Sequence, residues 1–366
     1  MQRDLETEFL TLHEFAAAAR RRLDANGWGY LIGGAETETT VRRNRQALDA
    51  IALRPRVLRD VSQIDSTATL FGKPARLPVL LAPVGGLETC DAQGAVAAAR
   101  GAGGFGVPVM VSSVSKRSKA EIRQATASPV LFQLYVRGGG RFIEDHVEEA
   151  MAAGLEAFCL TVDTAVYSRR ERDIVNRFNK PWRAGVDDAA QRAQAALTWK
   201  DVERIHRMCD IPLILKGIAT AEDARIALDH GVEVIYVSNH GGRQLDHGLG
   251  AIDLLPGIVE AVGGRATIIV DGGFMRGTDI VKALALGADA VGLGRLYCYA
   301  LAAAGAPGIV RMLEILEDEL RSAMGLLGVT RLSELDPSYV QRGAPAVSTP
   351  SALSAFPLLG PEGGGG

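Results

Sequence analysis

A histidine and an arginine lie three residues apart on a glycine-containing loop, directly after a short apolar run. These residues, His240 and Arg243, belong to the segment 238–246, which follows the run 234–237. An imidazole can take up a proton near neutral pH, and a guanidinium can bind a carboxylate through two parallel hydrogen bonds. The segment therefore predicts proton abstraction from a small carboxylic acid, although a lone His-x-x-Arg pair also occurs in surface loops that bond only to their own turn.

Short apolar runs that end in small or polar residues recur along the chain and predict parallel strands buried on both faces. The runs are 77–83, 107–113, 130–136, 157–163, 212–217, 234–239, 267–273 and 289–294. Helical patterns alternate with them, for instance at 94–103, 143–153, 221–230 and 277–286. Eight such units predict an α/β fold, a (β/α)8 TIM barrel, which needs about 250 residues. A doubly wound sheet is the alternative, and the lack of a dinucleotide-binding fingerprint disfavours it.

Polar residues gather where these predicted strands end, and in such barrels the chemistry lies at the C-terminal strand ends. The set is Ser112, Ser113, Gln133, Tyr135, Thr161, Asp163, Lys216, Ser238, His240, Arg243, Asp271, Gly294 and Arg295. Buried polar side chains are costly unless they are hydrogen-bonded. Their concentration at one rim predicts a ligand there.

Composition is that of a soluble enzyme. The 366 residues carry a net charge of −3, which gives no electrostatic reason to expect nucleic acid or an anionic membrane as a partner. We find no run of about 18 apolar residues and no signal peptide in the polar N-terminus, so we expect a cytoplasmic protein that binds small molecules or copies of itself. The four cysteines are widely spaced and predict neither a metal site nor a disulfide framework.

The predicted barrel, 76–335, is flanked by two further segments. In 1–75 we expect a helix at 12–23, a glycine-rich break at 27–35 and a second helix near 38–49, the whole packing on the barrel and closing its N-terminal end. The segment 336–366 is a C-terminal tail, which from Gly343 onward has the composition of a surface arm or a disordered end. We assign it no chemistry.

Several ordered motifs resemble one enzyme family. They are 33–35 (GGA) after Tyr30, 54–61 (RPRVLRDV), 132–135 (FQLY), 160–164 (LTVDT), Arg169-Arg170 with 176–178 (NRF), Lys216-Gly217, 238–246 (SNHGGRQLD) and 271–273 (DGG). Over about 12–335 the chain resembles the FMN-dependent L-2-hydroxy acid oxidase/dehydrogenase family, which includes glycolate oxidase, lactate oxidase, lactate monooxygenase and mandelate dehydrogenase. The resemblance implies FMN as cofactor, oxidation of an L-2-hydroxy acid to the 2-oxo acid, and a homo-oligomer of four or eight subunits.

The resemblance also implies roles for individual residues. His240 matches the base that takes a proton from the substrate, and Asp163 would orient it and stabilise the imidazolium. The implied catalytic set is His240, Asp163, Tyr135 and Lys216. The implied substrate-binding set is Tyr30, Tyr135, Arg170 and Arg243, with the two arginines on the carboxylate. Lys216 matches a cation beside flavin N1 and the C2 carbonyl; a strand lysine could instead form a Schiff base, as in barrel aldolases.

For FMN itself the resemblance implies contacts to the ring and to the phosphate. The cofactor-binding set is Val84, Gly85, Ser112, Gln133, Thr161, Lys216, Ser238, Asp271, Gly273, Gly294 and Arg295, with no metal. Many relatives carry two arginines after the Asp-Gly-Gly-x of strand seven, whereas this chain has Met275-Arg276. We therefore expect the phosphate to depend mainly on Arg295 and backbone amides.

Further departures concern the substrate and the electron acceptor. Val114 replaces an aromatic residue of glycolate oxidases and Tyr167 adds bulk and a hydroxyl, so a side chain larger than that of glycolate is expected. The span 172–199 lacks an apolar membrane insert and the chain has no Cys-x-x-Cys-His haem site, so oxygen or a soluble carrier is the expected acceptor. An FMN-dependent barrel isomerase, a lyase that uses Lys216 covalently, and a catalytically silent flavin-binding protein are the alternatives.

Overall fold

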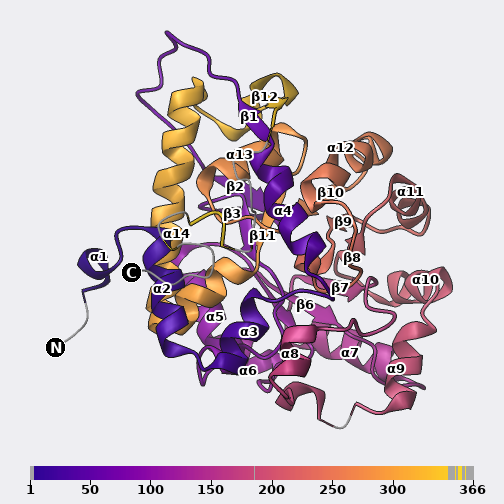
Figure 1. Cartoon of the computed structure of the whole chain (residues 1–366). Helices are drawn as coiled ribbons and strands as arrows, with labels where there is room; N and C mark the ends of the chain where they lie inside the picture. Colours follow the sequence, from indigo (N-terminus) through magenta and orange to yellow (C-terminus); the bar gives the residue numbers. More distant parts are fainter. Residues whose placement is uncertain (1–3, 185, 345–350, 352, 357–358, 360–366) are drawn as a thin grey trace.

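Eight parallel strands close into a barrel in the computed structural model, which describes residues 4–184, 186–344, 351, 353–356 and 359 (Figure 1). The strands are β4 (Val79–Leu81), β5 (Val109–Ser112), β6 (Val130–Leu134), β7 (Ala157–Thr161), β8 (Leu213–Ile218), β9 (Val234–Val237), β10 (Thr267–Val270) and β11 (Ala290–Leu293). They pair in the order β10-β11-β4-β5-β6-β7-β8-β9. Each lies within or close to one of the eight apolar runs, and the predicted TIM barrel is confirmed.

The register of the strands aligns the polar residues at their C-terminal ends. Ser112 of β5 lies opposite Gln133 of β6, and Thr161 of β7 lies opposite Lys216 of β8. Because parallel strands in register end at the same rim, residues far apart in the sequence become neighbours there. The barrel therefore delivers the predicted collection of polar side chains to one face.

The opposite, N-terminal end of the barrel is filled with apolar side chains. Its buried cluster comprises Leu70, Ala75, Leu80, Met110, Leu131, Ala157, Cys159, Ile214, Val234, Tyr236, Ile269 and Ala290. Leu70 and Ala75 come from a hairpin, β2 (Ala68–Leu70) with β3 (Lys73–Ala75), that precedes the barrel. We expected segment 1–75 to close the N-terminal end of the barrel. Only the β2–β3 hairpin, the last part of this segment, does so.

The helices of segment 1–75 are α1 (Leu5–Glu8), α2 (Leu12–Arg22), α3 (Ala25–Ile32) and α4 (Thr39–Asp49). The predicted glycine-rich break is wrong in its first part, because Gly27 and Gly29 lie inside α3. The Asp24 side chain starts this helix by accepting a hydrogen bond from the Gly27 amide at 2.7 Å. A Cβ at Gly27 would lie 2.9 Å from Thr89, so glycine permits close packing there rather than ending the helix.

Helices outside the barrel cover the strands. They are α5 (Ala95–Phe105), α6 (Lys119–Gln124), α7 (Phe142–Ala152), α10 (Trp199–Met208), α11 (Ala221–Asp229), α12 (Ala251–Val262), α13 (Gly277–Ala285) and α14 (Arg295–Leu327), with the short α8 (Glu171–Val175) and α9 (Asp188–Ala195) between β7 and α10. The four helices predicted at 94–103, 143–153, 221–230 and 277–286 are present as α5, α7, α11 and α13.

The 33-residue α14 is long and apolar enough to cross a membrane by length and composition alone, although its backbone leaves the helical conformation at Ala304 and Gly305. However, 67% of its apolar window is buried inside the protein, as in the core helix of a soluble domain. It packs against α5 and α2, and Figure 1 shows it running along the side of the barrel beside them.

The C-terminal segment begins with regular structure. β12 (Val340–Arg342) pairs antiparallel with β1 (Ile51–Leu53) and so joins the two flanking segments. Of the predicted surface arm, residues 345–350, 352, 357–358 and 360–366 lie outside the described residues. The described Phe356 is fully buried and its ring packs against His13 of α2, so at this point the tail is not a surface arm. The segment boundaries at 75/76 and 335/336 stay predictions.

Candidate active site

A hollow of about 1400 Å³, including the part open to solvent, lies at the C-terminal end of the barrel. Ligand sites typically occupy roughly 300–1,000 Å³. Twelve of the residues predicted for the site line it: Tyr30, Val84, Gly85, Tyr135, Arg170, Lys216, His240, Arg243, Asp271, Gly273, Gly294 and Arg295. The other predicted residues, Ser112, Gln133, Thr161, Asp163 and Ser238, do not line it. Several of them, as shown below, contact residues that do.

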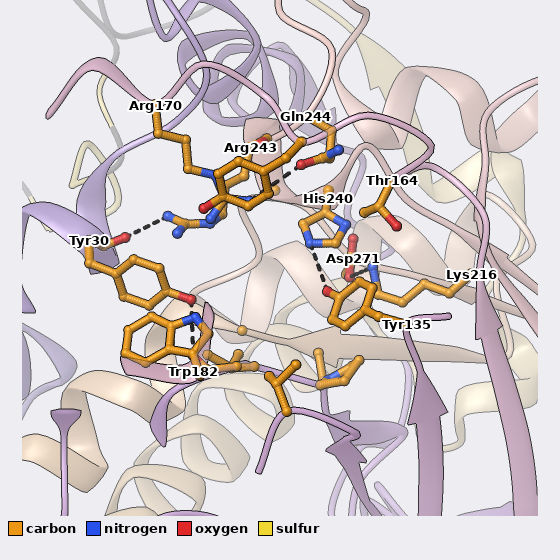
Figure 2. A pocket seen from close by; sticks show the side chains of 18 of the residues that line it. Tyr30, Tyr135, Thr164, Arg170, Trp182, Lys216, His240, Arg243, Gln244 and Asp271 are labelled. Carbon is orange, nitrogen blue, oxygen red and sulfur yellow. Dashed lines mark hydrogen bonds and ion pairs between the residues drawn. The ribbon is translucent and has the colours of Figure 1, made fainter. Parts of the chain in front are cut away.

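His240 is held between the carboxylate of Asp163 and the phenol of Tyr135, and Figure 2 shows its contact with Tyr135. Its Nδ1 lies 3.0 Å from Asp163 Oδ1, and its Nε2 lies 3.2 Å from the Tyr135 hydroxyl. A carboxylate only accepts hydrogen bonds, so Nδ1 carries the proton of the neutral ring and Nε2 is left as the base. The lone pair needed for proton abstraction is therefore on the nitrogen that faces Tyr135 and the pocket.

The backbone around this pair is constrained. His240 has a left-handed φ of 57°, and its amide donates to Ser238 Oγ at 3.0 Å. Gly217 has a φ of 112°, and a Cβ there would lie 2.6 Å from the Asp163 side chain. Only glycine fits beside this carboxylate without displacing it.

Burial and the surrounding charges set the protonation states of the pair. Burial lowers the pKa of His240, and the cations Lys216 and Arg170 lower it further, while Asp163 opposes them. For Asp163, burial acts to raise the pKa, but His240 and Lys216 outweigh it and the net pKa is lowered. Near neutral pH the pair is thus a neutral imidazole beside an ionised carboxylate, which is the form that a general base requires.

Lys216 belongs to a buried chain of polar groups. Its Nζ donates to Ser238 Oγ at 2.7 Å, and Ser238 Oγ donates to Asp271 Oδ1 at 2.6 Å; Lys216 Nζ also lies 3.2 Å from Asp271 Oδ2. Burial acts to lower the pKa of Lys216, but Asp271 and Asp163 outweigh it and raise the pKa. The amine stays charged, whereas Schiff-base formation needs it neutral, so the geometry disfavours the covalent lyase alternative.

Arg170 and Arg243 meet at the pocket without a carboxylate between them. Arg243 Nη1 donates to the carbonyls of Tyr30 (2.6 Å) and Gly33 (2.8 Å), while its Nη2 is buried with no hydrogen-bond partner among the described residues. Arg170 Nε lies 3.3 Å from the Arg243 carbonyl oxygen. Burial lowers the pKa of Arg170, and the like charge of Arg243 lowers it further. A buried arginine, Arg170, beside a partly buried one, Arg243, whose Nη2 is buried without a partner among the described residues, forms a site for an anion.

Tyr30 lies at the pocket as predicted, but its hydroxyl is engaged. It donates to the Gly85 carbonyl at 3.0 Å, and Arg243 stacks over its ring at 4.5 Å from the centroid. Tyr30 therefore fixes the position of Arg243 and of the chain at Gly85 in addition to bordering the substrate space.

Two predicted flavin contacts are buried polar groups that lack a partner among the described residues. Gln133 has both its amide nitrogen and its amide oxygen unpaired, and Thr161 has an unpaired hydroxyl. Such groups are costly unless a ligand satisfies them. The edge of an isoalloxazine ring presents alternating N–H and C=O groups, which suits an amide that both donates and accepts. These residues, with the charged Lys216, fit the ring of FMN.

At the predicted phosphate end, Arg276 does not reach the pocket. It pairs with Glu319 at 2.6 Å and donates to the Ala355 carbonyl, while Met275 lines the pocket. Arg295 donates to the carbonyls of Leu31, Gly33 and Gly241 at 2.8, 2.8 and 3.0 Å. Burial, then the charge of Arg243, lowers the pKa of Arg295 to about 10. At this end of the pocket, a phosphate can accept hydrogen bonds from the remaining N–H groups of Arg295 and from backbone amides.

The N-terminal segment holds the catalytic loop in place, which the sequence did not indicate. Asp246 accepts hydrogen bonds from the Thr37 hydroxyl (2.7 Å) and the Thr40 amide (2.8 Å). Asn44 of α4 and Asn239, next to His240, exchange side-chain hydrogen bonds of 3.0 and 2.7 Å. The loop that carries His240 and Arg243 is thereby fixed to α4 and to the residues just before it.

Other pocket residues were missed or given no role. Trp182 lies with its ring 4.8 Å from that of Tyr30, and a Cβ at Gly86 would lie 2.4 Å from it. It sits in a short 3-10 turn, Pro181–Arg183, within a polar span whose sequence has no periodic signal. Gln244 bonds to Arg170 at 3.4 Å, and its place inside 238–246 could have identified it. Among the described residues, no group of His, Cys, Asp or Glu is placed to hold a metal.

Comparisons with known proteins agree with this geometry. A family model described as FMN-dependent dehydrogenase matches residues 19–342. The chain is 39% identical to an L-lactate oxidase of a Nostoc species, covering 90% of this chain and 98% of the relative, and 37% identical to glycolate oxidase 1 of Zea mays, covering 96% and 99%. A crystal structure of mandelate oxidase superposes with a TM-score of 0.87 at 39% identity, covering 92% of this chain and 99% of that one.

Proposed function

Since this chain belongs to the family of FMN-dependent dehydrogenases, we propose that it oxidises an L-2-hydroxy acid larger than glycolate and passes the electrons to oxygen or a soluble carrier. At the level of the family, the chain is an FMN-dependent 2-hydroxy acid oxidase/dehydrogenase, as are the lactate and glycolate oxidases that it resembles. The comparisons support this activity and not the isomerase or lyase alternatives.

The observation that carries the proposal is the position of His240 Nε2, in a pocket that is also lined by the buried Arg170 and the partly buried Arg243. Arg170 and Arg243 bind the substrate carboxylate, with the unpaired Nη2 of Arg243 as one donor. This places the neighbouring carbon and its hydroxyl beside His240 and Tyr135, whose side chains are 3.2 Å apart. Holding the substrate in one orientation lowers the entropic part of the barrier.

His240 takes a proton from the substrate at Nε2. The developing imidazolium is stabilised by Asp163 at 3.0 Å, which is ionised and already oriented. FMN, when bound, supplies the acceptor for the two electrons that leave the substrate. Lys216 places a permanent positive charge close to Gln133 and Thr161, the residues that would hold the ring, and so favours negative charge there.

One residue, Val114, supports a substrate larger than glycolate. Val114 lines the pocket where glycolate oxidases have an aromatic residue, which leaves more space. Trp182 borders the same space from a different segment, next to Gly85 and Tyr30. The proposed substrate side chain lies between them.

The wider setting is also proposed. Exposed apolar side chains occur in the loops after β7 and β9, Val166 at 76% and Leu245 at 81%, and apolar surface of this kind supports association with further copies. We propose a homo-oligomer of four or eight subunits, without a membrane or nucleic acid as partner. The four cysteines are free, which supports a cytoplasmic location.

The experiment has two steps. Acid precipitation of the purified protein followed by chromatography is expected to release FMN, and recovery of FAD or of no flavin from folded protein contradicts the cofactor assignment. Anaerobic addition of a panel of L-2-hydroxy acids is then expected to bleach the visible absorbance of the flavin with at least one of them. A panel without effect contradicts the proposed function.

A further inference from the structure

The pocket holds more positive charge than one substrate carboxylate requires. Its lining includes Arg137, Arg170, Arg183, Lys216, Arg243 and Arg295, and among the described lining residues Asp271 is the only one with a carboxylate. Asp271 is paired with Lys216, and Arg295 is bound to three backbone carbonyls. With Arg170 and Arg243 on the substrate carboxylate, Arg137 and Arg183 remain.

These two arginines come from different segments that meet beside the catalytic tyrosine. Arg137 follows Tyr135 by two residues after β6, and its Nη1 donates to the Trp182 carbonyl at 3.0 Å. Arg183 directly follows Trp182 and stacks on the Tyr167 ring at 3.6 Å from the centroid. Both side chains are only partly exposed, so each guanidinium is held at the pocket wall rather than free in solvent.

Their charges are not neutralised by the protein. Burial lowers the pKa of Arg137, and the like charge of Arg183 lowers it further. The partners of the two guanidinium groups are a carbonyl and aromatic rings, which do not cancel a charge. Bringing two cations together in this way costs free energy unless an anion joins them.

Two unpaired hydroxyls line the same pocket, and one of them belongs to Tyr167, the ring on which Arg183 stacks. The Tyr167 hydroxyl and Thr164 Oγ1 are buried and have no hydrogen-bond partner among the described residues. Both residues line the pocket together with Arg137 and Arg183. A group with several acceptor atoms and a negative charge would satisfy the hydroxyls and both guanidinium groups, and a carboxylate has this chemistry.

We propose that the substrate is a 2-hydroxy dicarboxylate, whose second carboxylate binds Arg137 and Arg183 while its first binds Arg170 and Arg243. This inference rests on the proposed function and specifies its substrate class. The apolar side chains of Val114 and Trp182 contact the carbons between the two carboxylates.

The test compares substrates of equal chain length that differ only at the far end. (S)-2-hydroxyglutarate has a second carboxylate where (S)-2-hydroxypentanoate has a methyl group. Reduction of the bound FMN is followed anaerobically with each, and we expect kcat/KM to favour the dicarboxylate by about tenfold or more, the effect of one charge-assisted hydrogen bond. A 2-hydroxypentanoate or mandelate that reacts as well as the dicarboxylate overturns the proposal.

Variants localise the effect. Arg183→Gln and Arg137→Gln are each expected to lower kcat/KM for the dicarboxylate about tenfold and to leave the monocarboxylate unchanged. Arg141→Gln is the matched control, because Arg141 is exposed and pairs with Asp145 and Glu148 outside the pocket. Equal losses for both substrates overturn the proposal.

A binding measurement provides a readout that does not depend on turnover. Titration of the oxidised holoprotein with 2-oxoglutarate or 2-oxopentanoate, followed by the flavin spectrum, is expected to show tighter binding of the dicarboxylate, and Arg183→Gln is expected to remove the difference. If no hydroxy acid of either kind reduces the flavin, the proposed function itself fails. If only monocarboxylates reduce it, the function stands and the dicarboxylate inference fails.

Discussion

The two ends of the barrel are built from the same strands but from opposite kinds of side chain. The N-terminal end is filled by residues such as Leu80, Met110, Leu131 and Ile214, all buried and apolar. At the C-terminal end the same strands present Gln133, Thr161 and Lys216, and buried polar atoms of the first two have no partner among the described residues. Packing of the apolar side chains at the N-terminal end stabilises the fold. At the C-terminal end, the unpaired polar atoms lack hydrogen-bond partners, which a ligand can supply.

The segment before the barrel serves both ends. Its hairpin, β2 and β3, contributes to the apolar cluster; Asn44 of α4 bonds to the loop that carries His240, and the Tyr30 carbonyl of α3 accepts a hydrogen bond from Arg243 of the same loop. Substitutions at the apolar end are therefore expected to lower the stability of the fold without changing the rate of flavin reduction. Substitutions at the polar end are expected to lower the rate of flavin reduction without changing the stability.

The largest effect is expected at the apolar end. Leu131→Ala removes a fully buried side chain from the barrel interior and is expected to destabilise the protein by about 2–5 kcal/mol, the usual range for Leu→Ala in a core. The unfolding midpoint of the holoprotein is expected to fall, while anaerobic flavin reduction at low temperature stays at the wild-type rate. Leu249→Ala, at a side chain that is 57% exposed, is the control. If the unfolding midpoint of this variant falls as far as that of Leu131→Ala, the expected difference between a buried and an exposed leucine is contradicted.

His240→Ala is expected to have the next largest effect, this time on the rate. Without the base, flavin reduction by the best substrate is expected to slow by at least about a hundredfold, the low end of general-base contributions. Stopped-flow absorbance measures this, and the FMN content and unfolding midpoint are expected to stay close to wild type. A wild-type reduction rate would show that His240 is not the base.

Arg243→Lys keeps a positive charge but loses the planar fork of the guanidinium. The loss of part of a charge-assisted contact is expected to cost on the order of 1.5–3 kcal/mol, or about ten- to more than a hundredfold in kcat/KM. The amide of the best substrate is expected to react poorly even with the wild type. An amide oxidised as fast as the acid, in both proteins, contradicts the carboxylate assignment.

The smallest expected effect is a shift of the pH profile. The base must be neutral, so kcat/KM for flavin reduction is expected to fall as pH drops through the pKa of His240, which burial places below its ordinary 6.5. In Asp163→Asn the carboxylate that raises this pKa is lost, so the inflection is expected to move to lower pH. The plateau rate is also expected to drop, by less than in His240→Ala. An inflection that stays in place or moves upward contradicts the role of Asp163.

The barrel and most of its site were predictable because strand ends in a (β/α)8 barrel meet at one rim. Apolar runs located all eight strands, and polar residues at their ends located Lys216 and the 238–246 loop without any distance information. The roles of Arg170 and Tyr30 depended on the family resemblance, since Arg170 stands among other charged residues and Tyr30 lies outside the barrel.

What could not be predicted depends on contacts between segments without regular patterns. Trp182 and Arg183 lie in a single 3-10 turn, and their approach to Gly86 and Tyr167 has no local signal in the sequence. Gly27 predicts a break by its intrinsic preference, but packing against Thr89 and the Asp24 cap keep it in a helix. The hydrogen bonds between Asn44 and Asn239 join residues 195 positions apart, which neither helix periodicity nor strand alternation indicates.

The most direct test of the central claim is a single anaerobic turnover of the holoprotein with the best L-2-hydroxy acid, carrying hydrogen or deuterium at C2. We predict loss of the visible flavin absorbance with formation of one equivalent of the 2-oxo acid, a slower rate with deuterium because the C2–H bond breaks in this step, and no reaction with the D enantiomer. A protein that contains FMN, but whose absorbance is unchanged by every L-2-hydroxy acid tested, would contradict the account.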